Sequence, residues 1–172
     1  LSVGGVKLMA EVIKVIGKNA FVQVFESTRG MRVGDEAEFE GHMLEVTLGP
    51  GMLSRNYDGL QNDLDKMEGV FLRRGEYTFP LDNDKLWDFK PPAKVGDKVA
   101  AGGWLGEVDE NFQPHKIMVP FTFKGEYTVK SLKEAGQYTI GEVIAVLTDE
   151  TGKDVEVTMI QRWPVKRAIT CY

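Results

Sequence analysis

The sequence is poor in the residues that form disulfides and metal sites. Its 172 residues include one cysteine, Cys171, and two histidines, His42 and His115. A single cysteine excludes an intrachain disulfide, so a reducing compartment is the simpler expectation. The two histidines lie far apart in the sequence and lack metal-ligand spacing, so no zinc site is predicted.

Long apolar runs and an excess of basic charge are also missing. No stretch approaches the roughly 20 apolar residues of a membrane-spanning helix. Residues 1–12 show neither the cationic segment nor the apolar core of a signal peptide. The chain has 26 acidic and 21 basic residues, a formal net charge of −5. Nucleic-acid binding needs a clustered basic surface. We therefore expect no nucleic-acid partner, and membrane contact only indirectly, through other proteins.

The common catalytic motifs are absent from the sequence. A phosphate loop requires Ser or Thr directly after Gly-Lys, but Gly17-Lys18 precedes Asn19 and Gly152-Lys153 precedes Asp154. No G-x-S-x-G nucleophile elbow occurs. The acidic residues are scattered over turns, which favours a solvated surface over a paired-carboxylate site. By itself the chain is expected to be non-catalytic.

The dominant pattern is an alternation with a period of two residues. In residues 154–161, Val155, Val157 and Met159 alternate with polar residues, as in a strand with one solvated face. Three further segments are rich in β-branched or aromatic residues and read as strands. They are residues 10–16, 20–26 and 142–147. Glycine-rich turn signals separate such runs, so an all-β fold built from barrels or sandwiches is predicted.

Helix signals are few and short. Residues 57–69 carry apolar side chains at i, i+4 and i+7, with Gly69 as a stop, which predicts a helix of about two turns. In residues 131–136, Ser131 and Glu134 have the capping-box spacing, which predicts one turn. The predicted fold therefore contains one or two short helices.

Lys116, in the stretch QPHKIMVP, raises the question of a carried cofactor. Residues 94–108 and 119–147 resemble the two halves of biotinyl and lipoyl carrier domains, and Lys116 falls between them. Such a carrier needs its lysine exposed on a tight turn. Pro114 removes a backbone donor where a tight hairpin would use one, and the following residues read as a strand. A carrier lysine and an ordinary solvated strand lysine are the two alternatives.

A fuller resemblance covers nearly the whole chain. Motifs typical of the N-terminal β-barrel region occur at 22–30 (VQVFESTRG), 46–53 (VTLGPGML) and 57–61 (YDGLQ). Motifs typical of an inserted "bulge", or non-homologous, region follow at 71–75, 86–91, 95–108 and 115–120, and MIQRWPV stands at 159–165. In this order they resemble the catalytic A subunits of V-type and A-type rotary ATPases. Several motifs in one order are more specific than a lone fingerprint.

The resemblance implies a domain organisation. Residues 1–66 are expected to form an incomplete N-terminal β-barrel region with an exit helix, 67–160 a lipoyl/biotinyl-like barrel-sandwich bulge, and 161–172 a linker towards an absent nucleotide-binding domain. The barrel portion is expected to expose an unpaired edge that seeks a partner. One departure stands at 62–64, where Asn-Asp-Leu replaces the family's Arg-Pro-Leu.

The resemblance also implies a role for the segment. The full-length parent would be a rotary ATPase or ATP synthase that uses ATP and Mg and moves H⁺ or Na⁺. This segment would be a non-catalytic assembly part, without a cofactor of its own. Its partners would be other A and B subunits of the hexamer and the peripheral stalk. The complex would lie on the cytoplasmic face of a membrane. A generic all-β adaptor is the remaining alternative.

Three aromatic residues are candidate interface residues. Trp87, Phe89 and Trp104 lie beside predicted turns, close to the rigid Pro91-Pro92 connection. Large aromatics dominate both core burial and protein interfaces. A packed core and an exposed anchor for the stalk are therefore both consistent with the pattern.

Overall fold

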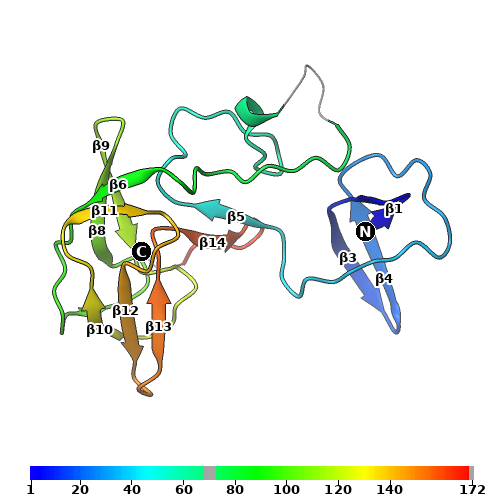
Figure 1. Cartoon of the computed structure of the whole chain (residues 1–172). Coiled ribbons are helices and arrows are strands. Elements are labelled where there is room, and N and C mark those ends of the chain that lie inside the picture. The colour runs from blue at the N-terminus through cyan, green and yellow to red at the C-terminus, as the bar shows by residue number, and fades with distance from the viewer. Residues whose placement is uncertain (68–72, 171–172) are drawn as a thin grey trace. The chain divides into compact units, whose positions relative to one another are not determined.

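The structure is a computed structural model that describes residues 1–67 and 73–170 (Figure 1). The chain forms two compact units. Unit 1 contains Leu1–Leu44 and Lys66–Thr78, and unit 2 contains Glu45–Asp65 and Phe79–Tyr172. Nearly all regular structure is β, which confirms the predicted all-β class. The domain boundaries expected from the resemblance, after residues 66 and 160, stay a prediction.

Unit 1 is built from two antiparallel hairpins. The first pairs β1 (Ser2–Val3) with β2 (Val6–Lys7), and the second pairs β3 (Ala10–Ile16) with β4 (Asn19–Val24). The strand predicted over residues 10–16 is confirmed with its bounds unchanged. Its register with β4 shifts between Val12 and Lys14, which leaves Ile13 as an inserted bulge residue.

The β3–β4 hairpin leaves apolar side chains in solvent. Ile13 and Val15 are both 65% exposed and Phe21 is 53% exposed, whereas Val3 and Leu8 are buried. Both sheets of unit 1 have two strands, so the described residues do not close a barrel. The exposed edge expected from the sequence is present. Whether it pairs with another copy stays a prediction.

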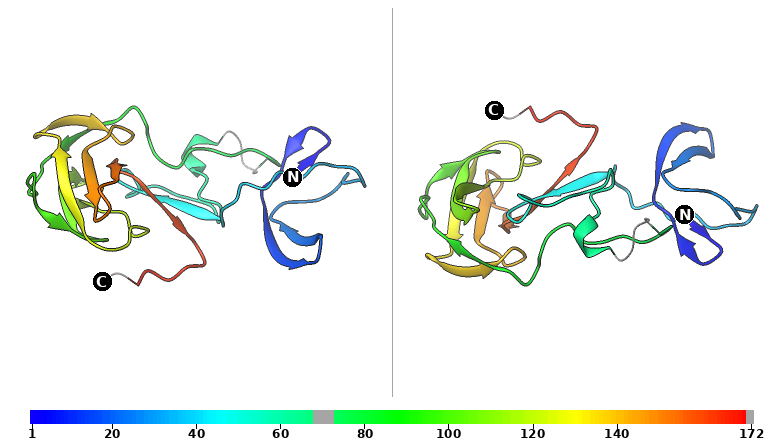
Figure 2. Two further views of the ribbon diagram at one scale, coloured as in Figure 1. Left: turned by 90° about the horizontal axis from the view of Figure 1, so that it is seen from below. Right: turned by 90° about the horizontal axis from the view of Figure 1, so that it is seen from above.

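Unit 2 carries the remaining strands (Figures 1 and 2). A four-stranded sheet has the order β13-β12-β10-β7, and three two-stranded pairs are β14-β5, β11-β6 and β8-β9. The bounds are β5 Glu45–Leu48, β6 Leu86–Phe89, β7 Lys98–Val99, β8 Trp104–Glu110, β9 Gln113–Met118, β10 Tyr127–Leu132, β11 Gly136–Thr139, β12 Ala145–Asp149, β13 Asp154–Val157 and β14 Gln161–Pro164.

Alternation along the strands builds the core of unit 2. Val157 and Met159 are buried while Asp154 and Glu156 are exposed, as the period of two predicts. The sheets bury one continuous apolar cluster. Its members are Leu81, Trp87, Phe89, Leu105, Val108, Ile117, Val119, Val129, Ile140, Ile144, Ala145, Leu147, Val157 and Met159.

Both helix predictions need correction. Of the segment predicted as a helix, residues 57–67 form turns and a single 3-10 turn, η1 (Leu64–Lys66), because polar side chains hydrogen-bond the backbone in a non-helical path. The predicted stop, Gly69, lies outside the described residues. In residues 131–136, Ser131 belongs to β10 and pairs with Val146 of β12. The sheet pairing overrides the capping-box signal. Among the described residues, no helix has the length and apolar content to cross a membrane.

Candidate functional site

Lys116 lies inside a strand, not on a turn. It is the cross-strand partner of Glu107 in the β8–β9 pair, and its side chain is 27% exposed. The Lys116 ammonium donates a hydrogen bond to the Glu107 carboxylate and stands 4.8 Å from the centre of the Trp104 ring. This hydrogen bond, together with the positive charge of Lys116, lowers the pKa of Glu107. A carrier lysine must reach out from a turn, so this position does not support the carrier alternative.

The turn between β8 and β9 is made by Asn111 and Phe112. Both have positive φ, 54° and 64°, as a two-residue type I′ turn requires. The Phe112 amide donates a hydrogen bond to the Asp109 carboxylate at 3.0 Å, and the Asn111 amide group donates to Ser54 Oγ at 3.1 Å. Phe112 is 95% exposed. The tip of the hairpin therefore carries a large apolar side chain in a conformation that favours glycine.

Glu110, the last residue of β8, is a buried acid that connects two parts of unit 2. Its side chain is 2% exposed. Its Oε1 accepts hydrogen bonds from Gly51 N at 2.7 Å and Leu53 N at 2.9 Å, and its Oε2 lies 2.7 Å from His115 Nδ1. A buried carboxylate is tolerated only with such partners. Glu110 therefore fixes the Gly-Pro-Gly loop against the β8–β9 hairpin.

The sequence analysis missed Glu110, although a signal was present. Leu105, Val108 and Glu110 are buried, whereas Trp104 and Asp109 are exposed. The alternation places Glu110 on the same face as Val108, at a position facing the core. An acidic residue at an inward position of an otherwise apolar face indicates a buried hydrogen-bonding role.

The loop YDGLQ is attached to β5 by one glutamine side chain. Gln61 Oε1 accepts from Thr47 N at 2.7 Å, and Gln61 Nε2 donates to Thr47 O, also at 2.7 Å. The side-chain amide therefore replaces a neighbouring strand for this residue of β5. Gln61 itself has a φ of 62°, a conformation that costs energy for a residue with a Cβ. The paired hydrogen bonds hold it there.

Asp58 organises the same loop from within. Its Oδ1 accepts from Leu60 N and Asn62 N at 2.9 and 2.8 Å, and its Oδ2 accepts from Asn62 Nδ2 at 2.8 Å. Burial alone would raise the pKa of Asp58, but these hydrogen bonds outweigh it and hold the pKa below its usual range. An Asx turn of this kind competes with helix formation.

Asn62 and Asp63 are among the most buried polar residues of unit 2. Asn62 is 4% exposed and Asp63 is 1% exposed. Asp63 Oδ2 lies 3.6 Å from Arg55 Nη1. Burial raises the pKa of the nearby Tyr57 hydroxyl, and the Asp63 carboxylate adds to the shift. Asn62 and Asp63 therefore belong to an internal polar network.

The three candidate interface aromatics occupy different environments. Trp87 is 4% exposed and Phe89 is 1% exposed, whereas Trp104 is 58% exposed. A Cβ on Gly106 would lie 1.9 Å from Phe89 Cε2, so the Phe89 ring rests directly on the backbone of β8. Trp87 and Phe89 therefore belong to the packed core, which was the first of the two alternatives; the second was an exposed anchor. Trp104 offers an exposed aromatic surface, and its contact with a partner stays a prediction.

Groups that bind metals are not brought together in the described structure. Within residues 1–67 and 73–170, no three His, Cys, Asp or Glu side chains gather closely enough to hold an ion. His42 and His115 belong to different units. His115 faces Glu110, and the His42 ring lies 3.3 Å from the Glu40 carboxylate.

Comparison with known proteins gives the family. Residues 78–166 match the model of the ATP synthase alpha/beta subunit barrel-sandwich domain, and residues 1–41 match the β-barrel domain of the ATP synthase alpha/beta family. The chain belongs to the ATP synthase alpha/beta family. Within unit 2, the strands that carry Glu110 and Lys116, and the turn that carries Phe112, lie in the part that matches the barrel-sandwich domain of this family.

Curated relatives within the ATP synthase alpha/beta family point to the V-type branch. The V-type ATP synthase alpha chain of Treponema denticola is 47% identical over all of this chain, and that of Borreliella afzelii is 48% identical over 98% of it. The chain spans about 30% of the length of each relative. These matches confirm the resemblance to V-type ATPases that the sequence motifs indicated.

Proposed function

We propose that this chain is a structural and assembly portion of the catalytic A subunit of a V/A-type ATPase. The parent would couple ATP hydrolysis or synthesis to the transport of H⁺ or Na⁺, with ATP and Mg bound elsewhere in the full-length polypeptide. The observation that supports this most is the identity of 46–48% to V-type ATP synthase alpha chains along the length of this segment.

The architecture of unit 2 fits a mechanical role in an assembly. Segments of unit 2 that are remote in the sequence are joined by non-covalent contacts. These are the β14–β5 strand pairing and the hydrogen bonds of the Glu110 carboxylate and the Gln61 amide. Buried and fully satisfied polar contacts rigidify a fold. We propose that unit 2 contacts the peripheral stalk and that unit 1 contacts neighbouring A and B subunits. The complex would lie on the cytoplasmic face of a membrane, which this segment touches only through its partners.

Two measurements test this proposal. In calorimetric titration, residues 1–172 should show no saturable micromolar binding of Mg-ATP, while the full-length parent should bind it. Removal of residues 79–160 from the parent should leave its nucleotide binding intact but reduce the yield of complete complexes and the ion transport coupled to ATP hydrolysis. A fully assembled and fully coupled complex without these residues would contradict the proposal and favour a generic adaptor.

A further inference from the structure

The turn of the β8–β9 hairpin carries an unusual residue for its conformation. Both turn residues lie at positive φ, where a type I′ turn favours Asn followed by Gly. Asn111 fits this preference, but Phe112 stands where glycine is favoured. Folding of the turn therefore gains nothing from the phenyl ring. The ring also gains nothing from burial, because Phe112 is 95% exposed.

A third residue with positive φ supports this turn. Ser54, with a φ of 62°, accepts a hydrogen bond from Asn111 Nδ2 at 3.1 Å. Three of the four described non-glycine residues with positive φ therefore cluster around one hairpin tip. Outliers of this kind persist where the surrounding structure holds them, and they gather at sites of function.

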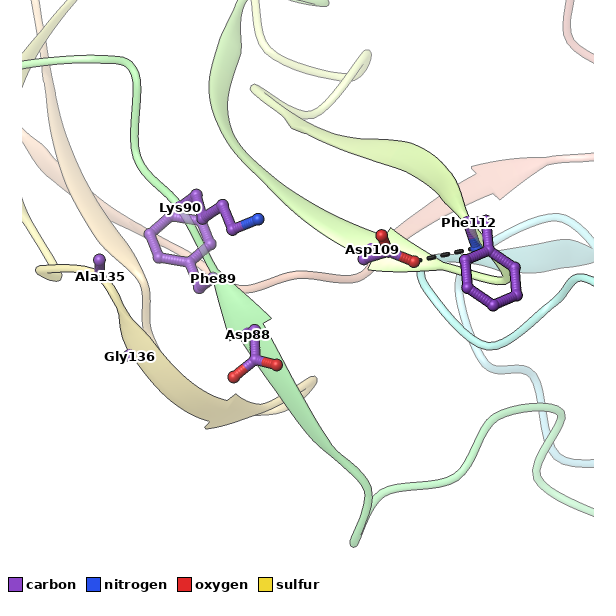
Figure 3. Close-up of a pocket in the computed structure, with 7 residues that line it drawn as sticks. All are labelled: Asp88, Phe89, Lys90, Asp109, Phe112, Ala135 and Gly136. Atoms are coloured by element: carbon purple, nitrogen blue, oxygen red, sulfur yellow. Dashed lines mark hydrogen bonds between the residues drawn. The ribbon is translucent and has the colours of Figure 1, made fainter.

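A groove lies beside the Phe112 ring (Figure 3). Its volume is about 660 Å³, and it is shared by β6, the β8–β9 turn and the start of β11. In Figure 3 the carboxylates of Asp88 and Asp109 and the ammonium of Lys90 belong to residues that line it. All of these residues belong to unit 2.

The charges along the groove are not balanced. Asp88 accepts a hydrogen bond from Gln137 Nε2 and Asp109 accepts one from Phe112 N, but neither forms an ion pair with another described residue. Two carboxylates against the single ammonium of Lys90 leave a formal charge of −2 + 1 = −1 along the groove. A partner that fits would bring positive charge and an apolar surface that covers the ring.

We propose that Phe112 and this groove form a docking surface for a basic, amphipathic segment of another protein. The apolar face of that segment covers the Phe112 ring, and its lysine or arginine side chains lie over Asp88 and Asp109. An exposed aromatic beside a depression is the kind of anchor that dominates protein interfaces. The inference rests on the proposed assembly role only in requiring a partner protein, and it defines the chemistry of that partner.

Site-directed photocross-linking in the complete protein, within its assembled complex, tests this docking surface. The photoreactive analogue p-benzoylphenylalanine replaces Phe112, and in a matched control it replaces Val95, which is 65% exposed on another turn of unit 2. After irradiation, mass spectrometry identifies the cross-linked peptides. We expect those from position 112 to contain an apolar residue with lysine or arginine within one helical turn of it.

Three outcomes would overturn the inference. The first is cross-linking from position 112 no stronger than that from position 95. The second is cross-linking to a second copy of this chain. The third is cross-linking to an acidic or uncharged segment. None of these outcomes bears on the deletion experiment that tests the assembly role, so the two proposals fail separately.

Two glycine variants separate the ring from the backbone. Phe112→Gly and Asn111→Gly each place glycine at a positive φ, so neither introduces backbone strain. We expect Phe112→Gly to leave the urea midpoint unchanged or raise it, and to weaken binding of the cross-linked segment by at least about tenfold. Asn111→Gly removes the hydrogen bond to Ser54 but keeps the ring, so it should weaken binding far less than Phe112→Gly does. Equal binding by Phe112→Gly and the native protein would contradict the docking role of the ring.

A charge variant tests the acidic side of the surface. Asp88→Asn keeps an oxygen that accepts from Gln137 and removes the negative charge. We expect this variant to bind the cross-linked segment about two- to fivefold more weakly, and its affinity to change less with salt concentration. An unchanged affinity with an unchanged salt dependence would remove charge complementarity from the proposal.

Discussion

The Glu110 carboxylate lies 2.7 Å from the backbone nitrogen of Gly51, a residue 59 positions earlier in the chain. Gly51 has a φ of +105°, which side chains with a Cβ rarely adopt. The contact therefore joins β8 to a loop whose backbone conformation at Gly51 favours glycine. Because Leu53 N donates to the same oxygen, the carboxylate acts as a cap for two backbone donors.

Removal of the Glu110 side chain should destabilise unit 2. Glu110→Ala leaves the Gly51 and Leu53 amides without their acceptor, so we expect the free energy of unfolding to fall by about 2–4 kcal/mol. Glu110→Gln keeps a carbonyl oxygen for both donors and should cost about 1 kcal/mol. Urea unfolding followed by tryptophan fluorescence measures both, because all three tryptophans lie in unit 2. Equal losses in the two variants would contradict the capping role.

A methyl group on Gly106 should disrupt the core. The added Cβ would lie 1.9 Å from Phe89 Cε2, so we expect Gly106→Ala to cost about 1–3 kcal/mol or more through overpacking. The matched control is Gly141→Ala, whose Cβ meets no atom within 4 Å and should change stability by less than about 0.5 kcal/mol. In the double variant, Phe89→Leu should recover part of the loss. Strict additivity in this double-mutant cycle would argue against the contact.

A Gln61→Glu variant should lose stability at pH 7 and regain part of it at low pH. Gln61→Glu keeps the acceptor for Thr47 N but removes the donor to Thr47 O, so we expect a loss of about 1–3 kcal/mol at pH 7. Below the ordinary glutamate pKa of about 4.3, the protonated carboxyl donates again, and the difference from the native protein should shrink. Unfolding midpoints of both proteins across this range measure the effect. A difference independent of pH would exclude the donated hydrogen bond as its cause.

Acid should weaken unit 2 partly through Asp149. Hydrogen bonds from the Thr151 hydroxyl and from Lys153 N lower the pKa of Asp149. Its ionised form therefore stabilises the fold fully above the unfolded pKa of about 3.9, and this contribution is lost as pH falls through the lower folded pKa. Asp149→Asn keeps an accepting oxygen without titrating, so its unfolding midpoint should fall less steeply with acidification. An identical pH profile for both proteins would remove Asp149 from the acid response.

Strand positions could be read from the sequence because the alternation of residues 154–161 reflects burial directly. Val157 and Met159 face the core and Glu156 faces solvent, as the pattern indicates. The two helix predictions, over residues 57–69 and 131–136, were wrong, one for a local reason and one for a tertiary reason. Asp58 hydrogen bonds compete with the helix in one segment, and pairing of Ser131 with Val146 overrides it in the other.

The contacts that join distant segments could not be predicted from the sequence pattern. The Gln61–Thr47 pair and the Glu110–Gly51 contact link residues 14 and 59 positions apart, and no periodicity specifies such pairs. Of the two alternatives for Lys116, the strand position is the one that the structure shows, and the β-branched and apolar residues that follow it were the signal for it. Its ion pair with Glu107 depends on the register of β8 and β9, which the turn at Asn111 and Phe112 sets.

The path of the chain between its two units has a practical consequence for dissecting the protein. The chain passes from one unit to the other after residues 44, 65 and 78. A fragment that starts at residue 79 would lose β5, and β14 would lose its partner strand. Unit 2 should therefore be recovered best by co-expressing residues 45–65 as a separate peptide, or by joining that segment to residue 79 through a short flexible linker.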